Sequence, residues 1–157
     1  MKNKKLWGAR FKQGTDPDFW AFSNSLDYDK TLLEYDIKGS LAHVKMLSKC
    51  NIIPKDKASS IENALSSLLK DCQNGKFKLD KKSEDVHTAV FIALSKKVGA
   101  IADYLHTARS RNDQVVLDVR MYCKDKLKDI IKLVTELQVA LVSFAKNNVD
   151  IVMPGYT

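Results

Sequence analysis

One uninterrupted segment near the C-terminus constrains the fold more than any other feature of this sequence. Residues 114–148 contain neither glycine nor proline, and apolar side chains recur there at intervals of three and four. The pattern predicts a helix about 50 Å long, because each helical residue adds about 1.5 Å. A compact domain of this size does not need such a rod. We therefore expect it to pack in a bundle against other copies or against a further part of the protein. The apolar stripe comprises Val115, Val119, Cys123, Leu127, Ile130, Val134, Leu137, Leu141 and Ala145.

Shorter helices are predicted upstream of this segment. Apolar periodicity indicates helices over residues 27–50, 56–73 and 86–97, with Asp27 as a cap of the first and Gly75 and Gly99 ending the other two. The sequence therefore predicts an all-α fold. Residues 1–110 form an N-terminal helical domain, and residues 111–157 begin a central helical bundle.

The first 26 residues show no clean period. Trp7, Phe11, Phe19, Trp20 and Phe22 are interspersed with glycine and proline, which predicts an extended arm with one helical turn near residues 16–23. Aromatic residues in such an arm cover either the core of their own chain or a neighbouring subunit.

Composition argues against several function classes. The net charge of +7 invites a nucleic-acid interpretation, but the lysines are scattered and no aromatic residues interleave with them. A basic nucleic-acid binder, with affinity that falls steeply with salt, stays as an alternative. No apolar run fits a signal peptide or a membrane span, so we expect a soluble cytoplasmic protein. Three cysteines without paired spacing predict reduced, mostly packed thiols.

The stretch before the long helix, HTARSRND at residues 106–113, is typical of an anion site at a helix entrance. Asn112 or Asp113 can cap the first turn, and the free N–H groups there favour negative charge. Arg109 and Arg111 each offer a planar fork that suits a carboxylate. The competing interpretation is a polar loop in which these arginines pair with Asp113 or Asp118.

HTARSRNDQV followed by VLDVR resembles the signature of the argininosuccinate lyase family, within the fumarase and aspartase superfamily. Further segments resemble the family in the same order, and the resemblance covers essentially the whole chain but only about the first third of a family chain. These segments are LWGARF at 6–11, SLDYDKTLLEYDIKGSLAH at 25–43, SEDVHTA at 83–89 and MPGYT at 153–157.

The resemblance implies reversible cleavage of argininosuccinate to arginine and fumarate, by a homotetramer that needs no cofactor and no metal. It implies that five residues bind substrate, namely Ser25, Ser110, Arg111, Asn112 and Thr157. No residue of this chain is a convincing catalytic base, because the resemblance places that group beyond Thr157. The chain is therefore expected to be the N-terminal part of the enzyme and inactive by itself.

His87 lies in the first turn of the predicted helix over 86–97, where the helix dipole disfavours a protonated imidazole. Spacing alone favours a capping or packing role. The resemblance implies that His87 lines the active site, as a supporting candidate for catalysis. Phe91 departs from the pattern, since the family commonly has a glutamate four residues after this histidine.

Two further functions stay open. One is a non-catalytic helical structural or interaction protein of the same fold, and the other is a different fumarate-releasing lyase of the superfamily.

Overall fold

A computed structural model describes residues 16–80 and 83–156, which form helices joined by short connections. These residues contain no strand, so the predicted all-α class is confirmed. The elements in chain order are α1 (Pro17–Ser23), α2 (Leu26–Asp29), η1 (Lys30–Leu32), α3 (Leu33–Lys49), α4 (Lys55–Gln73), α5 (Val86–Val98), η2 (Gly99–His106) and α6 (Arg111–Asn147).

The chain divides into two compact units, one ending at Val119 and one beginning at Arg120. Helix α6 contributes residues to both units. The domain boundary predicted from the sequence, after residue 110, marks the point where α6 begins and stays a prediction for the complete protein.

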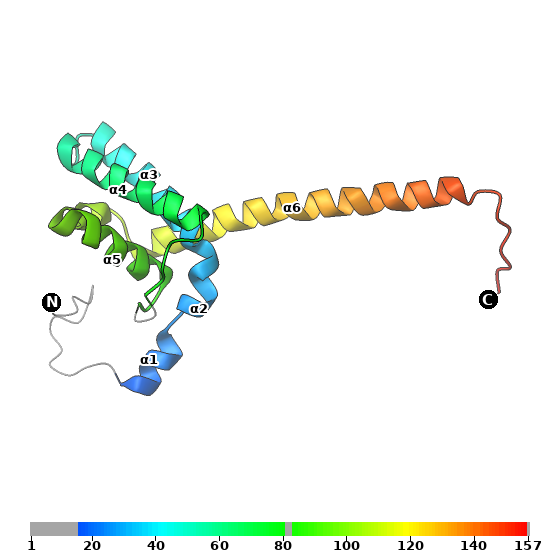
Figure 1. The fold of residues 1–157 in the computed structure, drawn as a ribbon, viewed down its shortest axis with the longest axis horizontal. Coiled ribbons are helices and arrows are strands. Elements are labelled where there is room, and N and C mark those ends of the chain that lie inside the picture. Colours follow the sequence, from blue (N-terminus) through cyan, green and yellow to red (C-terminus); the bar gives the residue numbers. More distant parts are fainter. Residues whose placement is uncertain (1–15, 81–82, 157) are drawn as a thin grey trace. The chain divides into compact units, whose positions relative to one another are not determined.

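The first unit is built on α3, α4 and α5, which pack against one another, with the 3-10 helix η2 on α4 and α5 (Figure 1). Each helix presents apolar residues at spacings of three and four, so one face is buried along its length. The core is made by Ile37, Val44 and Leu47 of α3, Ile61, Leu65 and Leu68 of α4, Val86, Val90 and Leu94 of α5, and Ala102 and Leu105 of η2.

Local sequence signals explain where these helices begin and end. Asp16 accepts hydrogen bonds from the N–H groups of Asp18 and Phe19 at 2.9 and 3.1 Å and starts α1. Gly75 and Gly99 follow α4 and α5 with φ of 67° and 63°, values that glycine adopts without steric cost. The predicted helical turn over 16–23 and the helix ends at both glycines are confirmed.

The predicted helix over 27–50 is wrong in one respect, because it is interrupted. The structure has the short α2, the 3-10 turn η1 and then α3. Asp27 is not a cap, since Ser25 precedes α2 and the Asp27 carboxylate is 95% exposed beside Lys30. The 3-10 helix η2 was not predicted.

Helix α6 has 37 residues, which confirms the long helix predicted over 114–148. At about 1.5 Å per residue its length is roughly 55 Å. Its buried residues are Gln114 and Asp118, whereas the predicted apolar stripe is exposed, Leu127 and Leu137 by 57% and 60%. The exposed stripe agrees with a helix that packs against partners other than the described residues.

Two other expectations concern side-chain burial. Cys50 and Cys123 are exposed and Cys72 is only partly buried, so the prediction of mostly packed thiols is wrong, although all three are free. Phe19 and Phe22 of α1 are 61% and 90% exposed and do not cover the core. Trp7 and Phe11 lie outside the described residues. No helix in the described ranges combines the length and apolar character needed to cross a membrane.

Candidate functional site

The start of α6 is fixed by a reciprocal pair of capping contacts. The Ser110 hydroxyl oxygen accepts the N–H of Asn112 at 3.1 Å, and the Asp113 carboxylate accepts the N–H of Ser110 at 2.9 Å. The capping oxygen of the first turn therefore comes from Ser110 rather than from Asn112, because α6 begins at Arg111 and the cap is the residue before it. Asp113 contributes the second contact, because its carboxylate accepts the N–H of Ser110. The Asn112 residue is exposed.

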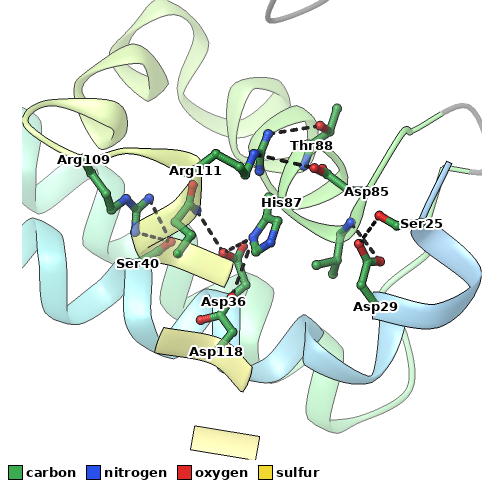
Figure 2. A network of polar contacts seen from close by, with 12 residues as sticks. Ser25, Asp29, Asp36, Ser40, Asp85, His87, Thr88, Arg109, Arg111 and Asp118 are labelled. Carbon is green, nitrogen blue, oxygen red and sulfur yellow. Dashed lines mark hydrogen bonds and ion pairs between the residues drawn. The ribbon is translucent and has the colours of Figure 1, made fainter. Parts of the chain in front are cut away.

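Arg111, the first residue of α6, reaches the first turn of α5. Its Nε lies 3.6 Å from the Asp85 carboxylate, and its Nη2 donates to the Thr88 hydroxyl over 3.4 Å (Figure 2). Asp85 also caps α5 by accepting the N–H of Thr88 at 2.6 Å. The third guanidinium nitrogen, Nη1, is buried and has no hydrogen-bond partner among the described residues. Arg111 is thus held in place with part of its donor capacity unused.

Arg109 lies in the connection before α6 and points toward α3. Both Nη atoms approach the Ser40 hydroxyl at 3.4 Å, and the buried Nε meets no hydrogen-bond partner in the described ranges. Burial lowers the pKa of Arg109, against the opposing charges of Asp36, Asp118 and Asp113. Within the part of the chain that the structure describes, no ion pair joins Arg109 or Arg111 to Asp113 or Asp118. The polar-loop alternative therefore lacks the pairs on which it depended.

Ser25 joins the beginning of α2 to the beginning of α5. Its hydroxyl donates to the Asp29 carboxylate at 2.7 Å, and the other oxygen of Asp29 accepts the N–H of Val86 at 3.2 Å. The Ser25 N–H also donates to the carbonyl of Glu84 at 2.9 Å. Burial raises the pKa of Asp29, and the hydrogen bond from Ser25 opposes that shift. Ser25, the first turn of α5 and Arg111 consequently converge on one region of the first unit.

His87 is the centre of a buried polar cluster contributed by three helices. Its Nδ1 lies 2.8 Å from Asp36 Oδ1 on α3, and the same oxygen accepts a hydrogen bond from Gln114 Nε2 on α6 at 3.0 Å. Asp118, one turn after Gln114, brings its Oδ2 to 3.7 Å from Nδ1. All four side chains are at most 3% exposed. His87 therefore has a defined set of polar partners rather than an apolar packing role.

The two carboxyl groups of this cluster have unusual electrostatics. Burial and the neighbouring Asp36 charge raise the pKa of Asp118 to about 8. Burial also raises the pKa of Asp36, while the positive charges of Arg109 and Arg111 and the hydrogen bond from Gln114 oppose the shift. One proton therefore resides on the pair at neutral pH, because two adjacent buried carboxylates do not both ionise. Asp36, His87 and Asp118 each offer a ligand atom, and these atoms lie within 4.8 Å of one another.

His106 and Phe91 lie beside this cluster. The two rings have centroids 4.9 Å apart at an angle of 49°. Burial lowers the pKa of His106, and the positive charge of Arg109 adds to this effect. Where the resemblance has a glutamate, this chain thus places an aromatic ring against a histidine that is biased toward its neutral form.

The structure brings together most, but not all, of the residues singled out from the sequence. Ser25, His87, Ser110 and Arg111 surround the first turns of α5 and α6, and Thr157 lies outside the described residues. Sequence reasoning missed Asp36, Ser40 and Gln114 and treated Asp118 only as a partner for the arginines. The available signal was a polar residue on a predicted apolar face, as with Asp36 beside Ile37.

Comparison with known proteins gives consistent matches along nearly the whole chain. A family model described as "Lyase" matches residues 9–157. A protein named argininosuccinate lyase from Acetivibrio thermocellus is 44% identical over 153 residues, which cover 98% of this chain and 33% of that protein. Proteins of the same name from Pelotomaculum thermopropionicum and a Sulfurihydrogenibium species are each 46% identical, covering 98% and 100% of this chain and 33% and 34% of their own lengths. The chain spans about a third of the length of these curated relatives.

Proposed function

The chain belongs to the lyase family whose model matches it, and we propose that it is the N-terminal portion of an argininosuccinate lyase, which cleaves argininosuccinate reversibly to arginine and fumarate. The observation that carries this proposal is the unused hydrogen-bonding capacity of the Arg111 guanidinium. It is held by Asp85 and Thr88 and retains a buried Nη1 without an acceptor among the described residues. A buried donor of this kind calls for an acceptor, and a substrate carboxylate supplies one with matching geometry.

The proposed chemistry divides between binding and proton transfer. Elimination requires a base that removes a proton next to a carboxylate, donors that hold the electron-rich carboxylate, and an acid that protonates the departing guanidinium nitrogen. Arg111, Ser110 and Asn112 serve as the donors for the succinyl part, with the hydroxyl groups of Ser25 and Thr157 beside them. The base comes from a later part of the enzyme, so this chain supplies binding and positioning.

The second unit supports a proposal about assembly. Leu127, Ile130, Leu137 and Leu141 of α6 are 54–60% exposed, and an exposed apolar face of this length indicates a protein interface. We place α6 and its copies from other subunits in the central bundle of a homotetramer. The active sites of this tetramer contain residues from several subunits. The enzyme works in the cytoplasm on a small-molecule substrate, without a cofactor, a metal, nucleic acid or a membrane.

Binding of substrate to this chain tests the role of Arg111. Argininosuccinate and fumarate are titrated into isotope-labelled protein, and chemical-shift changes at the starts of α5 and α6 are followed. Arg111→Ala should weaken binding at least about tenfold, because a charge-assisted hydrogen-bonded contact contributes about 1.5–3 kcal/mol. Arg120→Ala, on the exposed surface of the same helix, is the matched control. Equal affinity in Arg111→Ala and the parent chain would contradict the assigned role.

Catalysis is tested by joining this chain to the remaining two thirds of the Acetivibrio thermocellus relative. The chimera should release fumarate, measured by its ultraviolet absorbance, and Arg111→Ala should lower kcat/KM by about a hundredfold or more. The 157-residue chain alone should release none, even at high protein concentration. Turnover by the chain alone that disappears on Arg111→Ala would refute its expected inactivity.

Phe91 favours a second candidate function, a non-catalytic helical structural protein of the same fold. Its ring lies against His106 where the resemblance has a glutamate, so a carboxylate of the pattern is lost. The chimera separates the two functions. A folded, tetrameric chimera that makes no fumarate, and that gains activity on Phe91→Glu, would favour the structural role.

A further inference from the structure

The buried cluster around His87 includes polar groups to which the proposed binding of a dicarboxylate assigns no role. Asp36, Gln114 and Asp118 come from α3 and α6 and are at most 3% exposed. We propose that Asp36 is a positioning residue for His87: its carboxylate accepts the Nδ1–H of the imidazole and leaves Nε2 unprotonated, as a hydrogen-bond acceptor. The tautomer of His87 does not depend on the proposed function. Only the assignment of substrate as the partner of Nε2 rests on that function.

Hydrogen-bond geometry favours one direction for the contact between Asp36 and His87. Asp36 Oδ1 lies 3.0 Å from Gln114 Nε2 and 2.8 Å from His87 Nδ1. An amide nitrogen only donates, so this oxygen acts as an acceptor, and its second lone pair suits a second donor. A neutral histidine carries one N–H. If that hydrogen is on Nδ1, then Nε2 bears a lone pair, and no described residue hydrogen-bonds to it.

Asp118 keeps Asp36 in the charged form that this role requires. Its Oδ2 is 3.7 Å from His87 Nδ1, too far for a hydrogen bond. Burial and the negative charge of Asp36 raise the pKa of Asp118 to about 8, whereas the positive charges of Arg109 and Arg111 oppose the rise in the pKa of Asp36. We therefore place the proton of the pair on Asp118 and the negative charge on Asp36. The pair has distinct roles, because one carboxyl supplies the acceptor and the other stores the proton.

Charged groups near Asp36 favour this division. Arg109 from the connection before α6 and Arg111 from α6 favour the carboxylate form of Asp36. The other titratable neighbours are His87 on α5, His106 at the end of η2 and Asp118 on α6. A divalent cation is the other species that three ligand atoms within 4.8 Å can hold. Two permanent guanidinium charges nearby disfavour a divalent cation more than a single shared proton.

The tautomer of His87 is measurable in the chain itself. The sequence has three histidines, so nitrogen-15 labelling of histidine gives few signals, and His43→Gln and His106→Gln assign them. We expect His87 to show a protonated Nδ1 and an unprotonated Nε2 at pH 7. A dominant Nε2–H tautomer, or a fully protonated ring, in the parent chain would overturn the inference without any variant.

Two amide substitutions distinguish the roles of the paired carboxyl groups. Asp118→Asn mimics a protonated acid and should leave the Nδ1–H tautomer dominant. Asp36→Asn keeps the shape but removes the charged acceptor, so the Nε2–H form should rise at least severalfold. Equal tautomer ratios in Asp36→Asn and the parent chain would count against Asp36 as the positioning residue.

Metal binding is tested on the same signals. We expect an equimolar addition of Zn²⁺, or treatment with a chelator, to leave the His87 resonances unchanged. Shifts of the His87 signals that a chelator reverses, and that Asp118→Asn abolishes, would replace the proton with a cation and overturn the proposal. Because the tautomer is read without substrate, failure of argininosuccinate binding would defeat the proposed function and leave this inference standing.

Discussion

Two stretches of α6 show opposite relations between polarity and burial. In the stretch that belongs to the first unit, Gln114 and Asp118 are 3% and 1% exposed, while Val116 is 56% exposed. In the stretch that belongs to the second unit, the residues at apolar stripe positions, such as Ile130 and Leu137, are 54% and 60% exposed. One continuous helix therefore buries polar side chains in one stretch and leaves apolar ones uncovered in the other.

In α6 the available partner, rather than hydropathy, decides which side chains are buried. Gln114 and Asp118 are buried because Asp36 and His87 complete their polar contacts, and a buried polar group without such partners is costly. Apolar residues of α6 after Arg120, such as Leu127 and Leu137, are instead 57% and 60% exposed. Their apolar face therefore indicates where further protein packs.

We expect the greatest loss of stability on removal of the acceptor at the centre of the buried polar cluster. Asp36→Ala leaves His87 and Gln114 without their shared acceptor and removes a negative charge that acts on Arg109. We expect a loss of about 3–5 kcal/mol in the free energy of unfolding, as for a broken buried ionic contact. Urea denaturation followed by circular dichroism measures it. Asp36→Asn is the isosteric control and should cost less. A loss below about 1 kcal/mol for Asp36→Ala would mean that the cluster does not stabilise the fold.

Asp118 makes the same stretch sensitive to pH. Its pKa is raised in the folded state to about 8 from a usual value of 3.8, so the folded chain binds a proton that the unfolded chain releases. The stabilisation from this group is complete below about pH 4 and is lost as pH rises to about 8. Asp118→Asn cannot lose a proton. Relative to the parent chain, it should gain more than about 1 kcal/mol of unfolding free energy between pH 5 and pH 8.

Denaturation curves of both proteins at several pH values measure this difference. Asp27→Asn, on a carboxylate that is 95% exposed, serves as the control and should show no comparable trend. A difference in unfolding free energy between Asp118→Asn and the parent chain that stays constant across this pH range would show that Asp118 does not carry the buried proton.

Asp85 lies at the edge of the polar cluster and combines a helix cap with a contact to Arg111. Asp85→Ala removes the acceptor of the Thr88 N–H and should cost about 0.5–2 kcal/mol. Asp85→Ser keeps a capping oxygen and should recover most of that loss without restoring the charge. Thermal unfolding of both variants measures the separation. Equal losses would assign the whole effect to the charge opposite Arg111.

The sequence predicted the regular parts of this molecule well. The apolar spacing in α4, α5 and α6 and the glycines at positions 75 and 99 act locally, so helix types and several ends followed from neighbouring residues alone. The break between α2 and α3 was not predicted, because the residues on both sides favour helix. Nor was the 3-10 helix η2, whose apolar residues pack without a regular α-helical period.

The candidate site was predicted only where one short segment carries it. Ser110 and Arg111 stand together in the sequence and were predicted as a group. The partners of His87 were missed because Asp36 and Gln114 are 78 residues apart and meet only through packing of α3 and α6. A lone polar residue on an apolar face is ambiguous until its partner on another helix is known. Resemblance supplied His87 itself but not the reason for its orientation.

The smallest expected effect belongs to the apolar face of the second unit. Leu137→Ala, at a position 60% exposed, should change the unfolding free energy of dilute chain by less than about 0.5 kcal/mol. Leu65→Ala in the buried core of the first unit should cost about 2–5 kcal/mol. In the chimera, whose proposed tetramer supplies partners for this face, the loss for Leu137→Ala should instead rise toward the core value. Leu137→Ala could instead lower the unfolding free energy of the dilute chain as much as Leu65→Ala does. If that loss then falls on further dilution, self-association of the chain buries this apolar face. That result would show that copies of these residues pair with one another without the rest of the proposed enzyme.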